Sequence, residues 1–228
     1  MGTTNPPHPD DWEDRYHVAA SATSTAVGTH VLKHDDTFAI VDRFGDISPE
    51  NSSEQGVYHA GTKFVSKLRL SIQGQRPLLL NSNVSRDNSL LQVDLTNPDL
   101  HDKDERVVVP QGTVHLARSK FTQDITLFDR IVLSNYGSGP VLLEMSLDFA
   151  SDFVDVFEVR GTQRAARGKL LAPLISRNSV TQRYLGRDDV LRQTHFEFAP
   201  IPEQLQPLRA TFFIRLESKQ CQEVSVWA

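Results

Sequence analysis

The chain has 228 residues, of which 39% are apolar and 23% charged, so it is long enough to bury a core without disulfides or metals. Its 24 basic and 29 acidic residues give a net charge of −5 and are mixed along the chain, which argues against binding to nucleic acid. The single cysteine, the absence of a long apolar stretch and the absence of a signal peptide predict a cytoplasmic protein without membrane contact.

Residues 1–28 are expected to form a flexible leader. They contain Pro6, Pro7 and Pro9, followed by a stretch rich in serine, alanine and threonine. Such a composition buries little apolar surface. No segment within residues 29–228 has the composition of a linker, so this part is predicted to form a single domain.

The hydrophobic pattern from residue 29 onward has the period of two that is typical of half-buried strands. Apolar residues of one parity recur in three clear sets, separated by polar residues of the other parity. These sets are Phe64, Leu68, Leu70 and Ile72; Leu91, Val93 and Leu95; and Ala210, Phe212, Ile214 and Leu216. After the first set, Gly74–Pro77 predicts a turn from which residues 78–80 begin the returning strand.

Ile131–Asn135 and Val141–Phe149 are predicted to form a long hairpin around the glycine-rich connector Gly137–Pro140. A short helix is expected at Asp188–Thr194, and no other segment shows sustained helical periodicity. Many strands with turn signals at short spacing therefore predict an all-β fold, and within that class a large antiparallel β-sandwich.

The most acidic segment contains Asp152, Asp155 and Glu158, closely preceded by Asp148. Two carboxylates about 5–10 Å apart can hydrolyse a glycosidic bond, although acidic residues are equally common at solvated strand ends. Arg160 could instead pair with one of these acids and fix the loop. Because phosphate-binding, dinucleotide-binding and nucleophile-elbow motifs are absent from the sequence, neither a catalytic residue nor a cofactor is predicted.

Five histidines are candidate metal ligands or catalytic groups. His30 and His34 lie in an extended segment, where a spacing of four residues separates the rings by roughly 13 Å and disfavours a shared metal. His59, His115 and His195 leave open a small sugar epimerase or isomerase, in which a histidine and a carboxylate face one groove.

Trp12 and Trp227 are the only tryptophans, and they are predicted to anchor the two ends of the chain. The competing interpretation is a stand-alone carbohydrate-binding module, which would display aromatic rings on one open face. Most of the twelve phenylalanines fall at core positions of the strand pattern, which argues against an open aromatic face of this kind.

Four segments carry a further signal through their order and spacing. They are Leu32–Asp46, Gly56–Ser66, Asp87–Pro98 and Asp152–Gly161. Together these segments resemble the N-terminal domain of bacterial glycogen debranching enzyme-like proteins, of the amylo-α-1,6-glucosidase type. The likeness is close up to Phe157 and looser towards the C-terminal end.

The resemblance implies a β-sandwich that precedes an (α/α)6 barrel, and the barrel supplies the catalytic carboxylates. The chain at hand stops at Ala228, so it is expected to be a non-catalytic part of a glycoside hydrolase. It would support a catalytic domain in the same chain or in another one, and it could contact α-glucan. An exposed apolar patch, or self-association into a homo-oligomer that hides such a patch, is expected.

The resemblance also suggests residues for substrate contact or for the domain interface. They are His59, Lys63, Asp87, Asn88, Asp152, Asp155, Glu158 and Arg160. One departure concerns the run after His59, where the family pattern resembles Arg-Asp-Thr-Arg and this chain has Gly61 in place of the aspartate and Lys63 in place of the second arginine. Replacing Asp155 and Arg160 by alanine is expected to weaken association with a barrel domain and to leave the melting temperature nearly unchanged.

Overall fold

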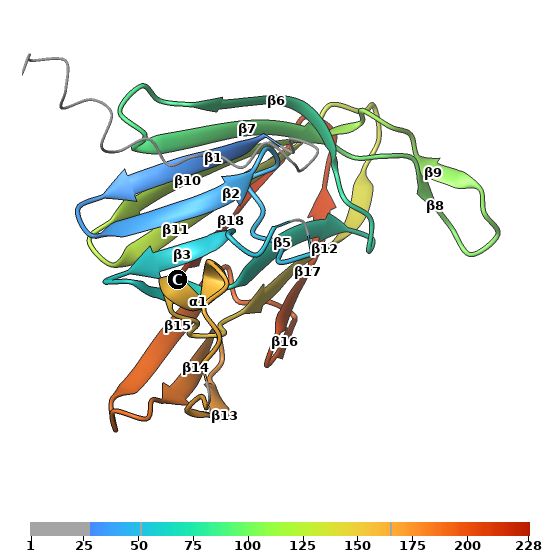
Figure 1. Ribbon diagram of the computed structural model, residues 1–228. Coiled ribbons are helices and arrows are strands. Elements are labelled where there is room, and N and C mark those ends of the chain that lie inside the picture. The colour runs from blue at the N-terminus through green and yellow to red at the C-terminus, as the bar shows by residue number, and fades with distance from the viewer. Residues whose placement is uncertain (1–27, 51, 165) are drawn as a thin grey trace, which may run out of the picture.

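A computed structural model describes residues 28–50, 52–164 and 166–228. It is 60% strand and 2% helix, which confirms the predicted all-β fold. The strands form antiparallel sheets packed in two layers (Figure 1). Nearly all of the predicted leader, together with Trp12, lies outside the described residues.

One layer is a single eight-stranded sheet with the order β13-β14-β15-β18-β11-β10-β7-β6. Its strands are β6 (Leu78–Val84), β7 (Leu90–Thr96), β10 (Val114–Gln123), β11 (Thr126–Asn135), β13 (Lys169–Ile175), β14 (Ser179–Leu185), β15 (Leu191–Ala199) and β18 (Cys221–Trp227). All neighbouring strands in this sheet are antiparallel.

The other layer contains two four-stranded sheets, with the orders β1-β2-β3-β4 and β16-β17-β12-β5. Their strands are β1 (Thr29–His34), β2 (Thr37–Asp42), β3 (Gly56–His59), β4 (Thr62–Val65), β5 (Lys67–Ile72), β12 (Val141–Ala150), β16 (Gln204–Gln206) and β17 (Arg209–Leu216). A short ribbon of β8 (Leu100–His101) and β9 (Val107–Val109) and the helix α1 (Val156–Val159) complete the described elements.

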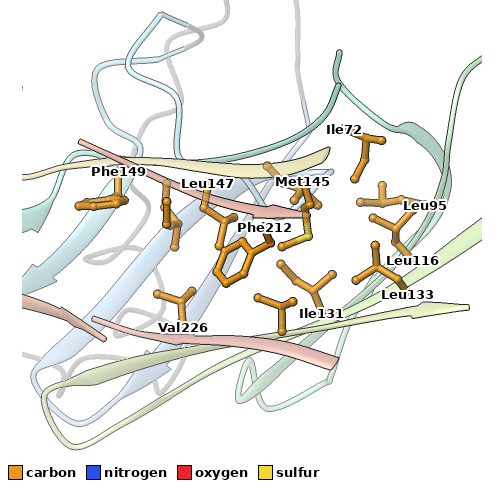
Figure 2. Close-up of a cluster of buried hydrophobic side chains, with 14 of the residues drawn as sticks. Ile72, Leu95, Leu116, Ile131, Leu133, Met145, Leu147, Phe149, Phe212 and Val226 are labelled. Atoms are coloured by element: carbon orange, nitrogen blue, oxygen red, sulfur yellow. The ribbon is translucent and has the colours of Figure 1, made fainter. Parts of the chain in front are cut away.

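The part of the apolar core drawn in Figure 2 lies between the eight-stranded sheet and the β16-β17-β12-β5 sheet, and the core continues into the β1-β2-β3-β4 sheet through Leu32 and Val41. Met145 and Phe212 project from one layer towards Leu116, Ile131 and Leu133 of the other, and all five side chains are buried. Burying one such side chain contributes roughly 1.5–3 kcal/mol, so this packing is the main force that holds the layers together. The predicted buried sets within β7 and β17 are confirmed.

The face of β10 that supplies Leu116 to the core next carries Arg118 and Lys120, and both are fully buried. They are covered by the β1-β2-β3-β4 sheet and its loops. The Arg118 guanidinium donates to Asp46 at 2.6 Å and to Asp129 at 2.8 Å, and Lys120 also bonds Asp129. We call the residues that meet here the buried charge cluster. They are Asp42, Asp46, Arg76, Arg118, Lys120 and Asp129.

The predicted hairpin of Ile131–Asn135 with Val141–Phe149 is wrong. Strand β11 pairs with β10 and β18, whereas β12 pairs with β5 and β17 in the opposite layer. The Asn135 side-chain amide donates to the carbonyls of Gly139, at 2.9 Å, and Leu216, at 3.1 Å. These bonds turn the chain from one layer into the other, which a tight hairpin connector would not do.

Two predictions about the first apolar set also need correction. The turn at Gly74–Pro77 exists, but β6 then joins the opposite layer instead of returning beside β5. The set is split between β4 and β5, and the break between these strands reverses the alternation. Lys63 is therefore buried, and Phe64 is only half-buried.

The helix expected at Asp188–Thr194 is absent, and a β-turn leads directly into β15. The Asp188 carboxylate accepts hydrogen bonds from the Val190 backbone N–H, at 3.2 Å, and from the Arg192 side chain. An aspartate that bonds the backbone two residues ahead stabilises a turn rather than a helix interior.

Candidate functional site

The segment after β12 forms a short capped helix on the surface. Asp155 is the N-cap of α1, and its Oδ1 atom accepts a hydrogen bond from the Phe157 backbone N–H at 2.8 Å. The Glu158 carboxylate accepts in return from the Asp155 backbone N–H at 3.4 Å, which completes a capping box. The Asp-x-x-Glu spacing of this acidic segment is thus explained by helix capping.

The β3–β4 hairpin holds this helix in place. The Val156 backbone N–H donates to the Gly61 carbonyl at 2.9 Å, and the Lys63 backbone N–H donates to the Val154 carbonyl at 2.8 Å. The buried Lys63 ammonium donates to the Ser53 carbonyl at 3.0 Å and lies 3.4 Å from the Asp152 carboxylate. Lys63 and Asp152 therefore fix the segment from beneath instead of offering a binding group to the surface.

A polar cleft of about 230 Å3 opens between α1 and the β14–β15 hairpin, and we call it the charged cleft. The charged and aromatic residues that line it are Asp155, Glu158, Arg164, Arg167, Arg187, Asp188, Arg192, Phe153 and Tyr184. Arg164 lies 3.0 Å from Asp155, and Glu158 lies 3.6 Å from both Arg164 and Arg167. Arg164 and Arg167, and not Arg160, are thus the arginines that pair with Asp155 and Glu158.

A second, more apolar cleft of about 360 Å3 lies beside β4 and β15, and we call it the aromatic cleft. Its lining includes Phe64, His59, His195, Gln193, Glu197 and Trp227. His59 Nδ1 lies 2.9 Å from the Thr37 hydroxyl, and His195 Nε2 lies 3.9 Å from the Glu197 carboxylate. Trp227, at the end of β18, forms part of the wall.

The two clefts share strand β15. Arg192 lines the charged cleft and the next residue, Gln193, lines the aromatic cleft. This follows from the strand geometry, because successive side chains point to opposite faces of a sheet. The β3–β4 hairpin also contributes to both clefts, through Thr62 and His59.

Asp87 and Asn88 line neither cleft and have roles in the β6–β7 turn. The Asp87 carboxylate accepts hydrogen bonds from the Ser85 and Ser89 hydroxyls, and these bonds lower the pKa of Asp87 to about 2. Asn88 adopts a φ of 55°, and its carbonyl accepts a hydrogen bond from the Lys33 backbone N–H at 3.0 Å. The predicted site residues thus separate into two groups that the fold does not bring together.

The structure also identifies site residues that the sequence reasoning did not. Arg187, Asp188 and Arg192 reach the charged cleft from the β14–β15 turn, and Tyr184 reaches it from β14. The run Gly186–Asp189 is the available signal, but its two aspartates fall in the segment Asp188–Thr194, for which the sequence predicts a helix. Once it is read as a hairpin turn, its charged side chains can converge on one end of the sheet.

No group of three histidine, cysteine or acidic side chains suited to a metal ion occurs among the described residues. His30 Nε2 lies 2.8 Å from the Ser82 hydroxyl, whereas His34 Nδ1 accepts from the Asp124 backbone N–H, so the two rings have separate partners. Within the same described ranges, no helix has the length and apolar character needed to cross a membrane.

Comparison with known proteins places the fold and its clefts in context. The sequence model of one family, described as the N-terminal domain of some glycogen debranching enzymes, matches residues 32–226. A comparison with curated proteins gave no significant match. The family match covers β2 to β17 completely, the second half of β1 and all but the last residue of β18. The chain therefore belongs to the family of N-terminal domains of glycogen debranching enzymes.

Proposed function

We propose that this chain is a non-catalytic domain of a glycoside hydrolase of the α-1,6-glucosidase type, and that it docks onto a separate (α/α)6 catalytic domain. The proposal rests on the exposed surface of α1, which the β3–β4 hairpin fixes in place. The Phe157 side chain is 59% exposed, although the backbone around it is bonded to the β3–β4 hairpin and its flanking acids are paired with arginines. Exposed apolar surface that the backbone holds in place supports a docking role when it forms part of a larger patch.

Further apolar side chains lie on the edge strand β13. Leu170, Leu174 and Ile175 are 61%, 55% and 50% exposed. Because β13 ends the eight-stranded sheet, its apolar side chains add to the apolar surface that the described residues leave exposed. An uncovered apolar edge strand invites pairing with another chain, so a covering domain has a clear structural purpose here.

The test places a photo-crosslinker at the docking surface of the natural protein. Phe157 is replaced by p-benzoylphenylalanine in the source cells, and crosslinked peptides are identified by mass spectrometry. The expected adducts are with helices of an (α/α)6 domain, in the same chain or in a partner chain. The same replacement at Leu80, which is 60% exposed on the other edge strand, serves as the control. Adducts confined to residues 1–228 would reject the docking role.

A second candidate function, direct contact with α-glucan, is favoured by the aromatic cleft. Trp227 and Phe64 offer ring surfaces to the apolar faces of pyranoses, and His59, Gln193 and Glu197 offer hydrogen-bonding groups to hydroxyls. Maltoheptaose should shift the fluorescence of Trp227 in a chain that carries Trp12→Phe, and Gln193→Ala should weaken binding. An unchanged spectrum and no heat at about 10 mM sugar would reject this function, since such binding would be weaker than about −3 kcal/mol.

A further inference from the structure

The charged cleft contains more positive charge than its own carboxylates neutralise. Four arginines line it, Arg164, Arg167, Arg187 and Arg192, against the three carboxylates of Asp155, Glu158 and Asp188. The lining therefore carries a net charge of about +1, whereas the whole chain carries −5. A local excess of positive charge on an acidic protein attracts anions to this point.

Three of the arginines are used within the cleft. Arg164 and Arg167 pair with Asp155 and Glu158, and Arg192 binds both oxygens of Asp188, at 3.0 and 2.8 Å. The hydrogen bonds from Arg192 are the main cause that lowers the pKa of Asp188 to about 2. This pair therefore stays ionised at neutral pH, and Arg192 is held in a fixed orientation at the cleft.

Arg187 is the fourth arginine of the charged cleft, and it has no carboxylate partner there. It is exposed, it lines the cleft, and it forms no hydrogen bond or ion pair with any residue that the structure describes. The neighbouring Tyr184 hydroxyl accepts a hydrogen bond from the Gly168 backbone N–H at 2.6 Å, so its own proton remains available to an acceptor in the cleft. Arg187 and Tyr184 thus offer unused donors to a ligand.

The wall of the cleft requires glycine at two points. A Cβ atom at Gly168 would lie 2.1 Å from the Leu185 carbonyl oxygen, and one at Gly186 would lie 2.1 Å from the Asp188 carboxylate. Side chains at these positions would displace Tyr184 or Asp188. The sequence therefore keeps the backbone close to the donors and the cleft open.

We propose that the charged cleft binds a small ligand through an oxyanion, a phosphate or a carboxylate group, with Arg187 as the principal donor and Tyr184 and Arg192 beside it. A guanidinium presents a planar pair of N–H groups that matches the geometry of such an oxyanion. This inference does not depend on the docking role of α1, because it concerns the cleft behind the helix and a small-molecule ligand.

The test measures binding of inorganic phosphate, glucose 6-phosphate and acetate to the purified chain by calorimetry at constant ionic strength. Phosphate-bearing ligands alone should bind if the site selects phosphate, and acetate should bind comparably if it selects oxyanions in general. Both results support the site. No heat with any of the three up to about 10 mM would overturn it.

The matched variants are Arg187→Gln and Arg177→Gln. Both remove one positive charge from an exposed arginine of the β13–β15 region, and neither side chain forms a hydrogen bond or ion pair within the described residues. Arg187→Gln should weaken phosphate binding about tenfold or more without a change in melting temperature, whereas Arg177→Gln should leave binding unchanged. Equal weakening by both variants would mean attraction to overall charge and would overturn the assigned site.

Discussion

Arg118 and Asp129 form a bidentate ion pair inside the sandwich, between adjacent strands of the eight-stranded sheet. The Arg118 Nε and Nη2 atoms lie 3.0 and 2.8 Å from the Asp129 carboxylate, and both side chains are fully buried. Arg118 also reaches Asp46 and the Phe44 carbonyl in the covering layer. The pair therefore belongs to a polar network that joins the two layers beside buried apolar side chains of the covering sheet, such as Leu32 and Val41.

Asp129→Asn is expected to destabilise the fold by about 3–5 kcal/mol, because it leaves Arg118 and Lys120 buried with too little negative charge. Burial alone would raise the pKa of Asp129, but the adjacent charges of Arg118 and Lys120 hold it below its usual value. Urea unfolding provides the measurement. The control is Asp148→Asn, whose partner Arg209 is half-exposed, and it should cost at most about 1 kcal/mol. Similar losses in the two variants would contradict the assigned role of the buried pair.

Stability should rise between about pH 8 and pH 10 because of Lys120. Burial, aided by the nearby charge of Arg118, lowers the pKa of Lys120 to about 8, whereas an unfolded lysine titrates near 10.4. In this interval the unfolded chain binds the proton that the folded chain has released, so the free energy of unfolding increases with pH. Urea unfolding at several pH values should show this rise, and Lys120→Met should remove it. A variant that retains the full rise would show that another group causes it.

The period-two pattern predicted individual strands well where one face of a strand packs against the core. Leu91, Val93 and Leu95 are buried in alternation because β7 has one covered face. The pattern could not predict strand partners, since these are set by contacts between distant segments. In β11, for example, Phe128 pairs with Trp227 of β18. Nor could it predict that Arg118 is buried, because its carboxylate partners come from other strands and loops.

The candidate site was predictable only in part, for the same reason. Asp155 and Glu158 were identified from the acidic segment, but their roles depend on capping and on Arg164, which lies in the following loop. Arg187 joins them only because the β14–β15 hairpin turns towards α1. A single sequence shows which residues have the right chemistry, whereas the pairing of strands decides which of them meet.

Asp155→Ala should lower stability by about 1 kcal/mol, the usual loss for an N-cap, and it should increase proteolysis near α1. The double replacement of Asp155 and Arg160 was expected from the sequence to leave the melting temperature unchanged. The structure gives the two residues different roles, because Asp155 caps the helix whereas the Arg160 side chain is exposed. Arg160→Ala is therefore the matched control and should leave thermal unfolding unchanged. A stable Asp155→Ala variant would mean that α1 does not need its cap.

Gly61→Asp tests the departure from the family pattern at the tip of the β3–β4 hairpin. Ala60 and Gly61 have φ angles of 45° and 79°, as in the two-residue turns that match the twist of antiparallel strands. A Cβ atom at Gly61 has room, with Val156 as its nearest neighbour at 4.0 Å, so only the left-handed backbone opposes substitution.

Gly61→Asp should cost about 1 kcal/mol and Gly61→Asn no more than that, since both residues tolerate this conformation better than others. Gly139→Ala, at an open position without a positive φ, is the control and should stay within about 0.5 kcal/mol of the parent in urea unfolding. A loss of several kcal/mol on Gly61→Asp would instead show that this turn cannot accept the aspartate of the family pattern while it holds α1.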